Sequence, residues 1–520
     1  MARTITVDPV TRIEGHLKIE ATVDDGVVKD AKSSGTLFRG FEILLQGRDP
    51  RDAQRITQRV CGVCPTAHAT ASTLNLDSAF GISGQVPDNG RIIRNLIFGS
   101  NFLQSHILHF YHLAALDFVD VTAAADYKGG DAGLKSLSEF LARGEPGPFV
   151  PRYEGDYRFD KATNQELARH YLLALDMRRL SQELLAMFGG KMPHNSSIVP
   201  GGVTQNPTVD KIAGFVWRLA KLRDFVDNVY IPDVIAVAKT YPDYFQIGAG
   251  PGNFLAYGVF ELDGTEPDYA KRKRLTAQGA LEGMSVLHDL DPDQITESVT
   301  HSWYEGAEPL HPSQGRTIPA AKKQAGYSWI KSPRYSGQVY EVGPLARTLV
   351  SYFAGREQIV SMVDGLLAEF GAEPGVLNST LGRHAARALE TKLVADSMAE
   401  WVLQLKPGEP VCAYYDMPEQ AQGMGITDAP RGALGHWMQI EDGKIANYQL
   451  VVPTTWNCSP KDEQGQHGPL EQAMIGTKVK DPDNPYELVR IVRSFDPCLA
   501  CSIHTIDARG TVRRRLTTTP

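Results

Sequence analysis

Two Cys-x-x-Cys pairs near opposite ends of the sequence constrain this chain more than any other feature. Cys61 and Cys64 form the first pair, and Cys498 and Cys501 form the second. A Cys-x-x-Cys segment on a turn that enters a helix aims both sulfurs at one point, and the exposed N–H groups at the helix start favour the thiolate. A site shared by both pairs must lie at the centre of the fold, because most of the chain separates them.

Each pair is followed by a histidine, His68 after the first and His504 after the second. Thiolates bind zinc, nickel and iron alike, so the spacing does not name the metal. A thioredoxin-type redox motif, a tetrahedral zinc site and a cubane iron–sulfur cluster all remain open on these residues alone. Zinc is less favoured here, because zinc ribbons usually close a short loop and two histidines would exceed four ligands.

The composition is that of a globular protein. Of the 520 residues, 42% are hydrophobic and 22% are charged, and this length predicts two to four lobes or one large multi-lobed unit. The formal net charge of -8 argues against a nucleic-acid partner, since no broad basic surface is implied. The sparse cysteines, mostly in Cys-x-x-Cys pairs, indicate metal or redox chemistry rather than a disulfide framework.

Neither end of the sequence predicts a membrane anchor or an export signal. No apolar run of about 18 residues occurs, so we do not expect the chain to span a membrane. The N-terminal segment MARTITVDPVTRIEG lacks both a secretory and a twin-arginine pattern, which predicts that the chain has no export address of its own. The basic cluster Arg513 to Arg515 is typical of a solvated tail.

Hydrophobic periodicity predicts a mainly α fold of the α+β class, with a central bundle of long helices and small peripheral β-sheets. One β-hairpin is expected over residues 4–32 and a second around Asp442-Gly443, followed by an extended PTTWN segment. Residues 240–340, rich in Gly, Pro and Tyr, predict irregular structure with strands. Helices are expected at about 51–60, 91–118, 161–189, 208–239, 344–371, 380–404 and 486–494.

Domain boundaries are soft, because neither an internal repeat nor a low-complexity linker occurs. We expect a β-hairpin region that leads to the first cysteine pair, a helical core in two parts with an irregular α+β insertion between them, a C-terminal region with the second pair, and a C-terminal extension. The β-hairpin region is 1–60, and the two parts of the helical core are 61–240 and 341–410. The insertion is 241–340, the C-terminal region is 411–504 and the extension is 505–520.

Extended motifs surround both cysteine pairs and continue along nearly the whole chain. RVCGVC near the start and DPCLAC near the end, each with its histidine, are highly specific in combination. The other motifs are VDPVTRIEGHLKIE at 7–20, TLFRGFEILLQGRDPRDAQ at 36–54, HFYHLAALDFVDV at 109–121, PHNSSIVPGGVT at 193–204, DAPRGALGHW at 428–437 and VVPTTWN at 451–457. Together they resemble nickel-iron hydrogenase large subunits of the uptake type, which implies that fold and the reversible heterolytic cleavage of dihydrogen.

The resemblance implies a binuclear metal centre. Cys61 and Cys498 would be terminal thiolates on nickel, and Cys64 and Cys501 would bridge nickel to an iron that carries carbonyl and cyanide ligands. Four thiolates bring four negative charges to a buried site, and two metal cations largely offset them. The residues implied to surround this centre are His68, Asp496, Pro430, Pro453 and Thr454.

A carboxylate and a guanidinium complete the implied machinery. Glu14 resembles the family's proton-relay carboxylate, which stands near the sulfur of Cys498. From local sequence alone, an ion pair between Glu14 and Arg12 at a strand end is the simpler interpretation. Arg431 resembles the arginine that overhangs the open metal position, and Asp496 would help to hold it.

A second cation and a trimmed tail are also implied. Glu42, the backbone carbonyl of Leu450, and His504 correspond to a magnesium site near the C-terminus, where iron could substitute. Residues 505–520 follow that histidine, and the resemblance implies that a maturation endopeptidase removes them after nickel is loaded. A charged tail with three arginines would oppose burial of His504, so we expect the working chain to end there.

Some positions depart from the family pattern. Ser105 stands where many members have Asp, Asp428 where Glu is common, and Cys458 where a small residue without sulfur is expected. None of these changes removes a metal ligand. Position 498 is Cys, so the selenium-containing variety is not indicated.

Cleavage of dihydrogen releases electrons that must leave the chain. Only Cys412 and Cys458 remain after the four ligands are assigned, too few for an all-cysteine cluster, and we expect both to be buried core thiols. The resemblance implies an iron–sulfur small subunit in a heterodimer or a dimer of heterodimers, a possible membrane cytochrome or quinone-linked subunit, and a periplasmic or membrane-associated location reached with the small subunit.

Two other hypotheses stay open. The chain could be a non-catalytic relative, like the quinone-module subunit of respiratory complex I, although retention of all four cysteines and of Arg431 argues against this. It could also be a zinc-stabilised scaffold.

Overall fold

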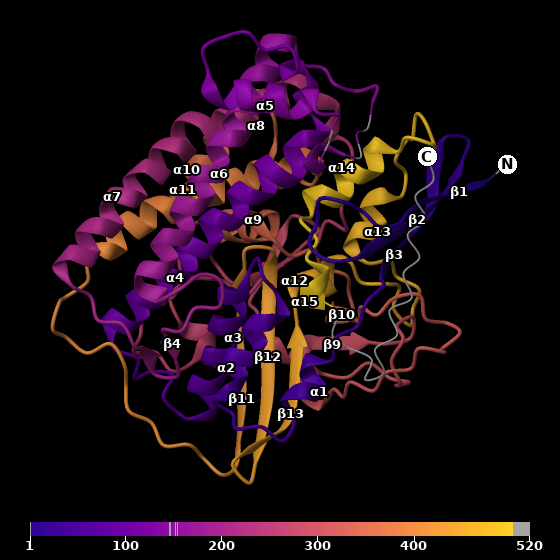
Figure 1. Cartoon of the computed structure of the whole chain (residues 1–520). Helices are drawn as coiled ribbons and strands as arrows, with labels where there is room; N and C mark the ends of the chain where they lie inside the picture. Colours follow the sequence, from indigo (N-terminus) through magenta and orange to yellow (C-terminus); the bar gives the residue numbers. More distant parts are fainter. Residues whose placement is uncertain (1, 145–146, 151, 153, 503–520) are drawn as a thin grey trace.

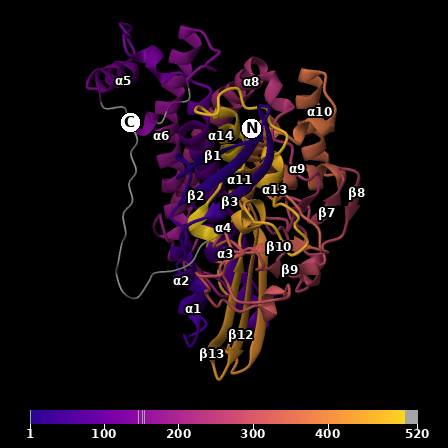
Figure 2. The same ribbon diagram turned by 90° about the vertical axis from the view of Figure 1, so that its right-hand side faces the viewer.

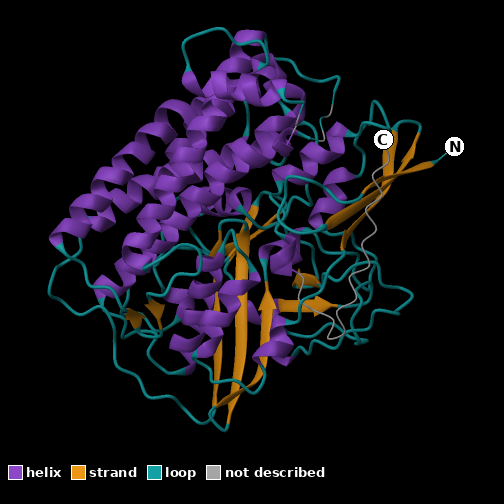
Figure 3. Cartoon of the chain, viewed as in Figure 1, coloured by secondary structure: helices purple, strands orange, loops and turns teal. Residues whose placement is uncertain are grey.

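The computed structural model describes residues 2–144, 147–150, 152 and 154–502, with only the backbone described for Pro148, Cys501 and Ser502 (Figure 1). The predicted His504 and tail 505–520 lie outside these residues. The predicted fold class is confirmed. Figure 3 shows long helices packed together in one half of the molecule and narrow antiparallel sheets with irregular segments in the other.

Four long helices form the centre of the bundle. Helix α4 packs against α6 and α11, and α7 packs against both α6 and α11. Helix α6 has the predicted limits because both ends are encoded locally: the carboxylate of Asp160 accepts a hydrogen bond from the N–H of Thr163, and Gly190 ends the helix at a φ of 81°. The bounds are α4 Asp88–Ile107, α6 Lys161–Gly189, α7 Val209–Phe225 and α11 Thr380–Val402.

Two of the long predicted helices change geometry along their length. The segment predicted at 91–118 continues beyond α4 as a π-helix, η2 (Leu108–Ala114), and then as a 3-10 turn, η3 (Ala115–Asp117). The segment predicted at 208–239 likewise contains a π-turn, η6 (Val226–Tyr230), before α8 (Ile231–Thr240). Single π-turns within helices often occur near functional sites.

Several helices differ from the prediction. The single helix expected at 344–371 is two helices, α9 (Pro344–Phe353) and α10 (Glu357–Phe370), because Gly355 between them has a φ of 69°. The PTTWN segment, expected to be extended, is a short helix, α12 (Pro453–Asn457). Helices α3 (Pro65–Ala79) and α5 (Ala132–Ala142) are among those that were not predicted. The remaining segments near the N-terminus are α1 (Phe41–Leu45), α2 (Asp52–Thr57) and η1 (Gln58–Val60).

Two three-stranded antiparallel sheets contain the predicted hairpins. The turns Asp25-Gly26 and Asp442-Gly443 both have positive φ angles, as hairpin turns of this length require. In the second sheet, strand β11 was not predicted, and it pairs with β12 so that Ala429 faces Gly432. The bounds are β1 Arg3–Val7, β2 Leu17–Asp24, β3 Val27–Gly35, β11 Ala421–Ala429, β12 Gly432–Glu441 and β13 Lys444–Val451.

Residues 240–340 form short strands joined by irregular segments, as predicted. These strands belong to two small antiparallel sheets, with the orders β6-β7-β8 and β10-β9. Their bounds are β6 Phe254–Ala256, β7 Gly279–Glu282, β8 Val286–His288, β9 Ile295–Ser298 and β10 Ser332–Tyr335. A further two-stranded hairpin, β4 (Ile198–Val199) with β5 (Gly202–Val203), lies beside α3 and α4.

The two ends of the described chain pack against each other. Apolar side chains of β1, β2 and β3 share one buried cluster with those of α13 (Pro469–Met474) and α14 (Tyr486–Ser494), and Figure 2 shows these elements side by side. Helix α14, which has the predicted limits, leads directly into the second cysteine motif and α15 (Leu499–Ser502). Within the described part of the chain, no helix has the length and apolar character needed to cross a bilayer.

Candidate metal centre

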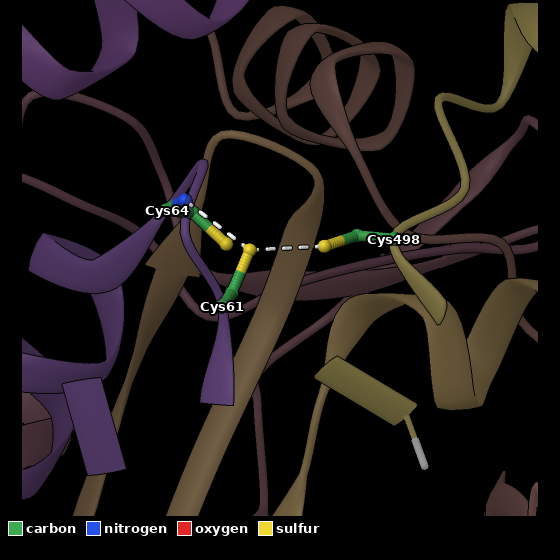
Figure 4. Close-up of side chains that lie close together, drawn as sticks. All are labelled: Cys61, Cys64 and Cys498. Carbon is green, nitrogen blue, oxygen red and sulfur yellow. Dashed lines mark hydrogen bonds between the residues drawn. The ribbon is translucent and has the colours of Figure 1, made fainter. Parts of the chain in front are cut away.

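The sulfurs of Cys61, Cys64 and Cys498 meet in the interior of the protein. All three atoms lie within 4.8 Å of one another, and Cys61 Sγ lies 3.2 Å from Cys498 Sγ, although 437 residues separate these two cysteines. Figure 4 shows the three side chains pointing toward a common centre from two distant segments of the chain. Each residue is at most 3% exposed. Cys501 follows in α15, but its side chain is outside the described residues.

The first pair lies on a turn that enters a helix, as predicted. Cys61 follows η1, and Cys64 is the residue just before α3, which begins at Pro65. The backbone N–H groups of Val63 and Cys64 point at Cys61 Sγ, at 3.2 and 3.3 Å. N–H groups at a helix start stabilise a thiolate, so the local backbone prepares Cys61 to be a metal ligand.

Glu14 lies beside the second pair. Its backbone forms a parallel β-bridge with Cys498, and its carboxylate Oε2 lies 3.1 Å from Cys498 Sγ. The same oxygen accepts a hydrogen bond of 2.9 Å from the N–H of Ala500. Burial, together with the nearby charge of Cys61, raises the pKa of Glu14 above its ordinary value. The carboxyl group therefore holds a proton more readily than an exposed glutamate.

The alternative ion pair between Glu14 and Arg12 is wrong. Arg12 instead donates a 2.6 Å hydrogen bond to Asp117, a buried carboxylate at the end of η3. Gly15 permits the approach of the Glu14 segment to α15, since it has a φ of 86° and a Cβ there would lie 2.7 Å from the Cβ of Leu499.

Arg431 occupies the two-residue turn between β11 and β12. Its guanidinium donates to the carbonyl of Asp496 at 3.1 Å, to the Asp496 carboxylate at 3.0 Å, and to the hydroxyl of Ser105 at 3.2 Å. Burial alone would lower the pKa of Arg431, but the charges of Asp496 and of the three cysteines outweigh it and raise that pKa. Arg431 is thus a fixed buried cation near the sulfurs.

Other predicted residues lie around the centre. The N–H of Cys498 donates a 2.9 Å hydrogen bond to the hydroxyl of Thr454, and Pro453 begins the helix that carries it. His68 Nδ1 hydrogen-bonds His436 Nε2 at 3.2 Å, and burial lowers the pKa of His68 to about 4, so the ring is neutral. A contribution of His68 to a cysteine sulfur stays a prediction.

Two residues of the predicted magnesium site, Glu42 and Leu450, are in contact, through the Leu450 N–H and not through the predicted carbonyl. The buried carboxylate of Glu42 accepts a 3.0 Å hydrogen bond from the N–H of Leu450 and another from the hydroxyl of Thr317. Lys331 Nζ lies 3.8 Å from Glu42 and 3.3 Å from the carboxylate of Glu297, whose Oε1 has no hydrogen-bond partner among the described residues. This oxygen-rich group suits a hard cation with bound water, although Lys331 already offsets part of its charge.

The two remaining cysteines differ in exposure. Cys458 is fully buried, as expected, and burial raises the pKa of its thiol. The expectation that Cys412 is also buried is wrong, because Cys412 lies exposed in the segment that joins α11 to β11, outside any helix. Neither residue belongs to the group of three sulfurs.

Two buried charged residues near the site were missed by sequence reasoning. Asp117 binds both Arg12 and Arg493, and so joins the segment that carries Glu14 to the helix that precedes Cys498. Arg347 binds the turn that carries Arg431. The only available signal was a charged residue within an otherwise apolar stretch, since buried charges require partners.

Three buried cysteine sulfurs from both ends of the chain, with metal-ligand spacing, are typical of a metalloenzyme that binds soft metals. The family model described as nickel-dependent hydrogenase matches residues 39–504, and a HoxL-like model matches residues 4–34. The chain belongs to the nickel-dependent hydrogenase family. It is an oxidoreductase that acts on dihydrogen.

Named relatives match along nearly their whole length. The periplasmic NiFeSe hydrogenase large subunit of Desulfomicrobium baculatum is 43% identical, over 97% of this chain and 95% of the relative. The uptake hydrogenase large subunit of Rhizobium leguminosarum bv. viciae is 38% identical, over 98% and 96% respectively. The solved structure of the H2-activated NiFeSe hydrogenase of D. baculatum matches with a TM-score of 0.85 and covers 97% of this chain and 100% of that one.

Proposed function

We propose that this chain is the catalytic large subunit of a nickel-iron hydrogenase that works in the uptake direction and passes electrons to an iron–sulfur small subunit. The observation that carries this proposal is the meeting of three buried cysteine sulfurs with one carboxylate, Glu14, and one fixed cation, Arg431. The uptake hydrogenase relatives support the direction.

The donor set fits a nickel–iron centre. Buried thiolates are soft anionic ligands, and divalent cations would offset the charge that Arg431 alone leaves uncompensated. Cys61, Cys64, Cys498 and Cys501 would hold the nickel–iron centre, whose iron would carry carbonyl and cyanide. When bound, this centre would supply the heterolytic cleavage of dihydrogen.

Glu14 would exchange a proton with the sulfur of Cys498. The 3.1 Å separation permits direct transfer between Sγ and Oε2, and the raised pKa of the carboxyl group brings its proton affinity closer to that of a thiol. Glu14 also lines a surface pocket of about 340 Å3 with His16 and Arg39, among other residues. This pocket would let a proton on Glu14 pass to solvent or to a partner.

Arg431 would act as a charge rather than as a proton carrier. Three hydrogen bonds hold its guanidinium, and its raised pKa keeps it protonated. A fixed cation in a water-poor site stabilises negative charge that develops nearby without further reorganisation.

Electrons must leave through a partner. Within the described residues, the three sulfurs are the single group of at least three His, Cys, Asp or Glu side chains with metal-ligand spacing. Leu37, Ile43 and Leu44, on and before α1, are exposed apolar side chains close in sequence to the first cysteine motif. The small subunit would cover them, in a heterodimer or a dimer of heterodimers.

The finer assignments follow the same reasoning. Glu42, the Leu450 carbonyl and His504 would hold magnesium or iron. A maturation endopeptidase would remove residues 505–520, and a membrane cytochrome or quinone-linked subunit would accept the electrons. The name of the D. baculatum relative supports a periplasmic location.

Metal analysis and infrared spectroscopy of the purified complex test the function. About one nickel and one iron per chain beyond the clusters of the small subunit, with infrared bands of bound carbonyl and cyanide, would support it. Zinc alone would favour a zinc-stabilised scaffold, and the absence of transition metal from this chain would favour a non-catalytic quinone-module relative.

A further inference from the structure

Arg347 is a fully buried arginine in the first turns of α9. Its guanidinium donates to two backbone carbonyls, Nη1 to Ala429 at 2.8 Å and Nη2 to Pro430 at 2.9 Å. These are the two residues that immediately precede Arg431. Ala429 pairs with Gly432 across the hairpin, so the hydrogen bonds from Arg347 hold the turn that carries Arg431.

The other side of the guanidinium is anchored in the bundle. Arg347 Nη2 lies 2.7 Å from Oε2 of Glu390, on α11, and the same oxygen lies 2.8 Å from His106 Nε2. Burial alone would raise the pKa of Glu390, but the charge and hydrogen bonds of Arg347 outweigh it and bring that pKa to about 2. The ion pair therefore stays charged, and a rigid helix fixes the position of Arg347.

The turn also packs tightly against the residues that precede α9. A Cβ on Gly432 would lie 2.6 Å from the backbone N of Gly343 and 2.7 Å from Cγ2 of Val342. Gly343 is the residue just before α9, so the helix start and the turn are in direct contact. The turn is thus in contact with both residues 342–343 and the guanidinium of Arg347, all at the start of α9.

We propose that Arg347 is a positioning residue that sets where the Arg431 guanidinium stands beside the three cysteine sulfurs. The inference rests on the proposed function, because it concerns the efficiency of that reaction. Arg347 makes no hydrogen bond to a cysteine or to Glu14 among those described, and it acts through the backbone of the turn. Its planar fork spans Glu390 and two carbonyls at once, which a single ammonium cannot do.

Arg347→Lys tests this inference, with Arg94→Lys as a matched control. Arg94 is also a buried arginine that binds a carboxylate, Asp77, and two backbone carbonyls of a hairpin, at Val199 and Gly202, whereas Arg347 has a second carboxylate, Asp428, at 3.4 Å. That hairpin is β4–β5, which carries none of the residues assigned to the metal centre. Both variants replace a buried guanidinium with an ammonium group, so the loss of stability from burying a lysine should be similar.

The variants are measured in the complex with the small subunit. For Arg347→Lys we expect nickel content and the infrared bands of bound carbonyl and cyanide to persist, with kcat for dihydrogen oxidation reduced about 10- to 100-fold, because displacement of a catalytic group by about 1 Å costs up to that much. KM for dihydrogen should change little, since a neutral apolar substrate gains no binding from the cation. Arg94→Lys should keep kcat.

A double-mutant cycle with Arg431→Lys separates positioning from general damage. If Arg347 acts through Arg431, Arg347→Lys should reduce kcat by much less in the Arg431→Lys background than in the native chain. Losses that multiply, or an unchanged kcat in Arg347→Lys, would overturn the inference. If Arg347→Lys does not assemble, Glu390→Gln, which loosens the same anchor, is put through the same cycle with the same criteria. A native complex without nickel would instead refute the proposed function.

Discussion

Glu14 Oε2 lies 3.1 Å from Cys498 Sγ, although 484 residues separate them in sequence. Two backbone contacts fix this relationship, since the N–H of Leu499 donates to the Glu14 carbonyl at 2.7 Å and the N–H of Ala500 donates to its carboxylate. The position of the carboxylate is therefore fixed by the β-bridge that joins segments from near the two ends of the chain.

Glu14→Gln is expected to reduce dihydrogen oxidation by about 100-fold or more, because an amide keeps the shape of the side chain but cannot exchange a proton, and proton transfer by a positioned group contributes about that much. Nickel content and infrared bands should match those of the native complex. Glu20→Gln, on strand β2 and paired with Lys18, is the control. Near-native turnover in Glu14→Gln would rule out this residue as the relay.

Cys498→Ser should abolish nickel binding, because a serine hydroxyl is a hard donor and is not ionised at neutral pH. Nickel per chain in the purified complex is the measurement. Cys412→Ser, at an exposed position away from the three sulfurs, should retain the full nickel content. Equal loss of nickel from both variants would mean that the assignment of ligands is wrong.

Asp117→Asn should destabilise the protein by about 3–5 kcal/mol, because it leaves the buried cations Arg12 and Arg493 without their carboxylate. Burial alone would raise the pKa of Asp117, but these two arginines outweigh it and lower that pKa below 3.8. The ionised carboxylate stabilises the fold at pH values above the pKa of Asp117 in the unfolded chain, which is about 4. This stabilisation is lost as the pH falls through the lower pKa that Asp117 has in the folded protein.

The difference in thermal midpoint between native protein and Asp117→Asn should thus be largest at neutral pH and shrink in acid. Asp126→Asn, which removes an exposed partner of Lys161, should change the midpoint little at any pH. A deficit that grows on acidification would contradict the assignment of the ion cluster to Asp117.

Glu42→Gln is expected to lower bound magnesium while nickel stays, because it removes the one carboxylate that both Leu450 and Thr317 contact. Elemental analysis of the complex after dialysis against metal-free buffer is the measurement. Glu441→Gln, an exposed glutamate on nearby β12, serves as the control. Unchanged magnesium in Glu42→Gln would exclude Glu42 as a ligand.

Locally encoded elements were predictable. Helix α6 and helix α14 have the predicted limits, since hydrophobic periodicity and end signals lie within each segment. Strand β11 was missed because its glycines serve tertiary packing. A Cβ on Gly425 would lie 2.1 Å from the backbone oxygen of Ala71 in α3, so this strand is shaped by the helix against it.

The PTTWN segment illustrates the same limit. Alternation and β-branched threonines favour an extended strand, yet Pro453 begins a helical turn that aims the Thr454 hydroxyl at the N–H of Cys498. No signal within five residues carries information about a partner in the C-terminal motif.

Sequence alone determined the class of fold and marked the cysteines as candidate metal donors, because residue type and spacing limit which chemistry is available. Glu14 and Arg431 became candidates only through the resemblance to hydrogenase large subunits. Only the tertiary structure decided which groups meet: Glu14 with Cys498 instead of Arg12, Arg12 with Asp117, and Arg347 with the turn before Arg431. The physical reason is that a buried charge must find a partner, and in a packed interior that partner is set by how distant segments fold together.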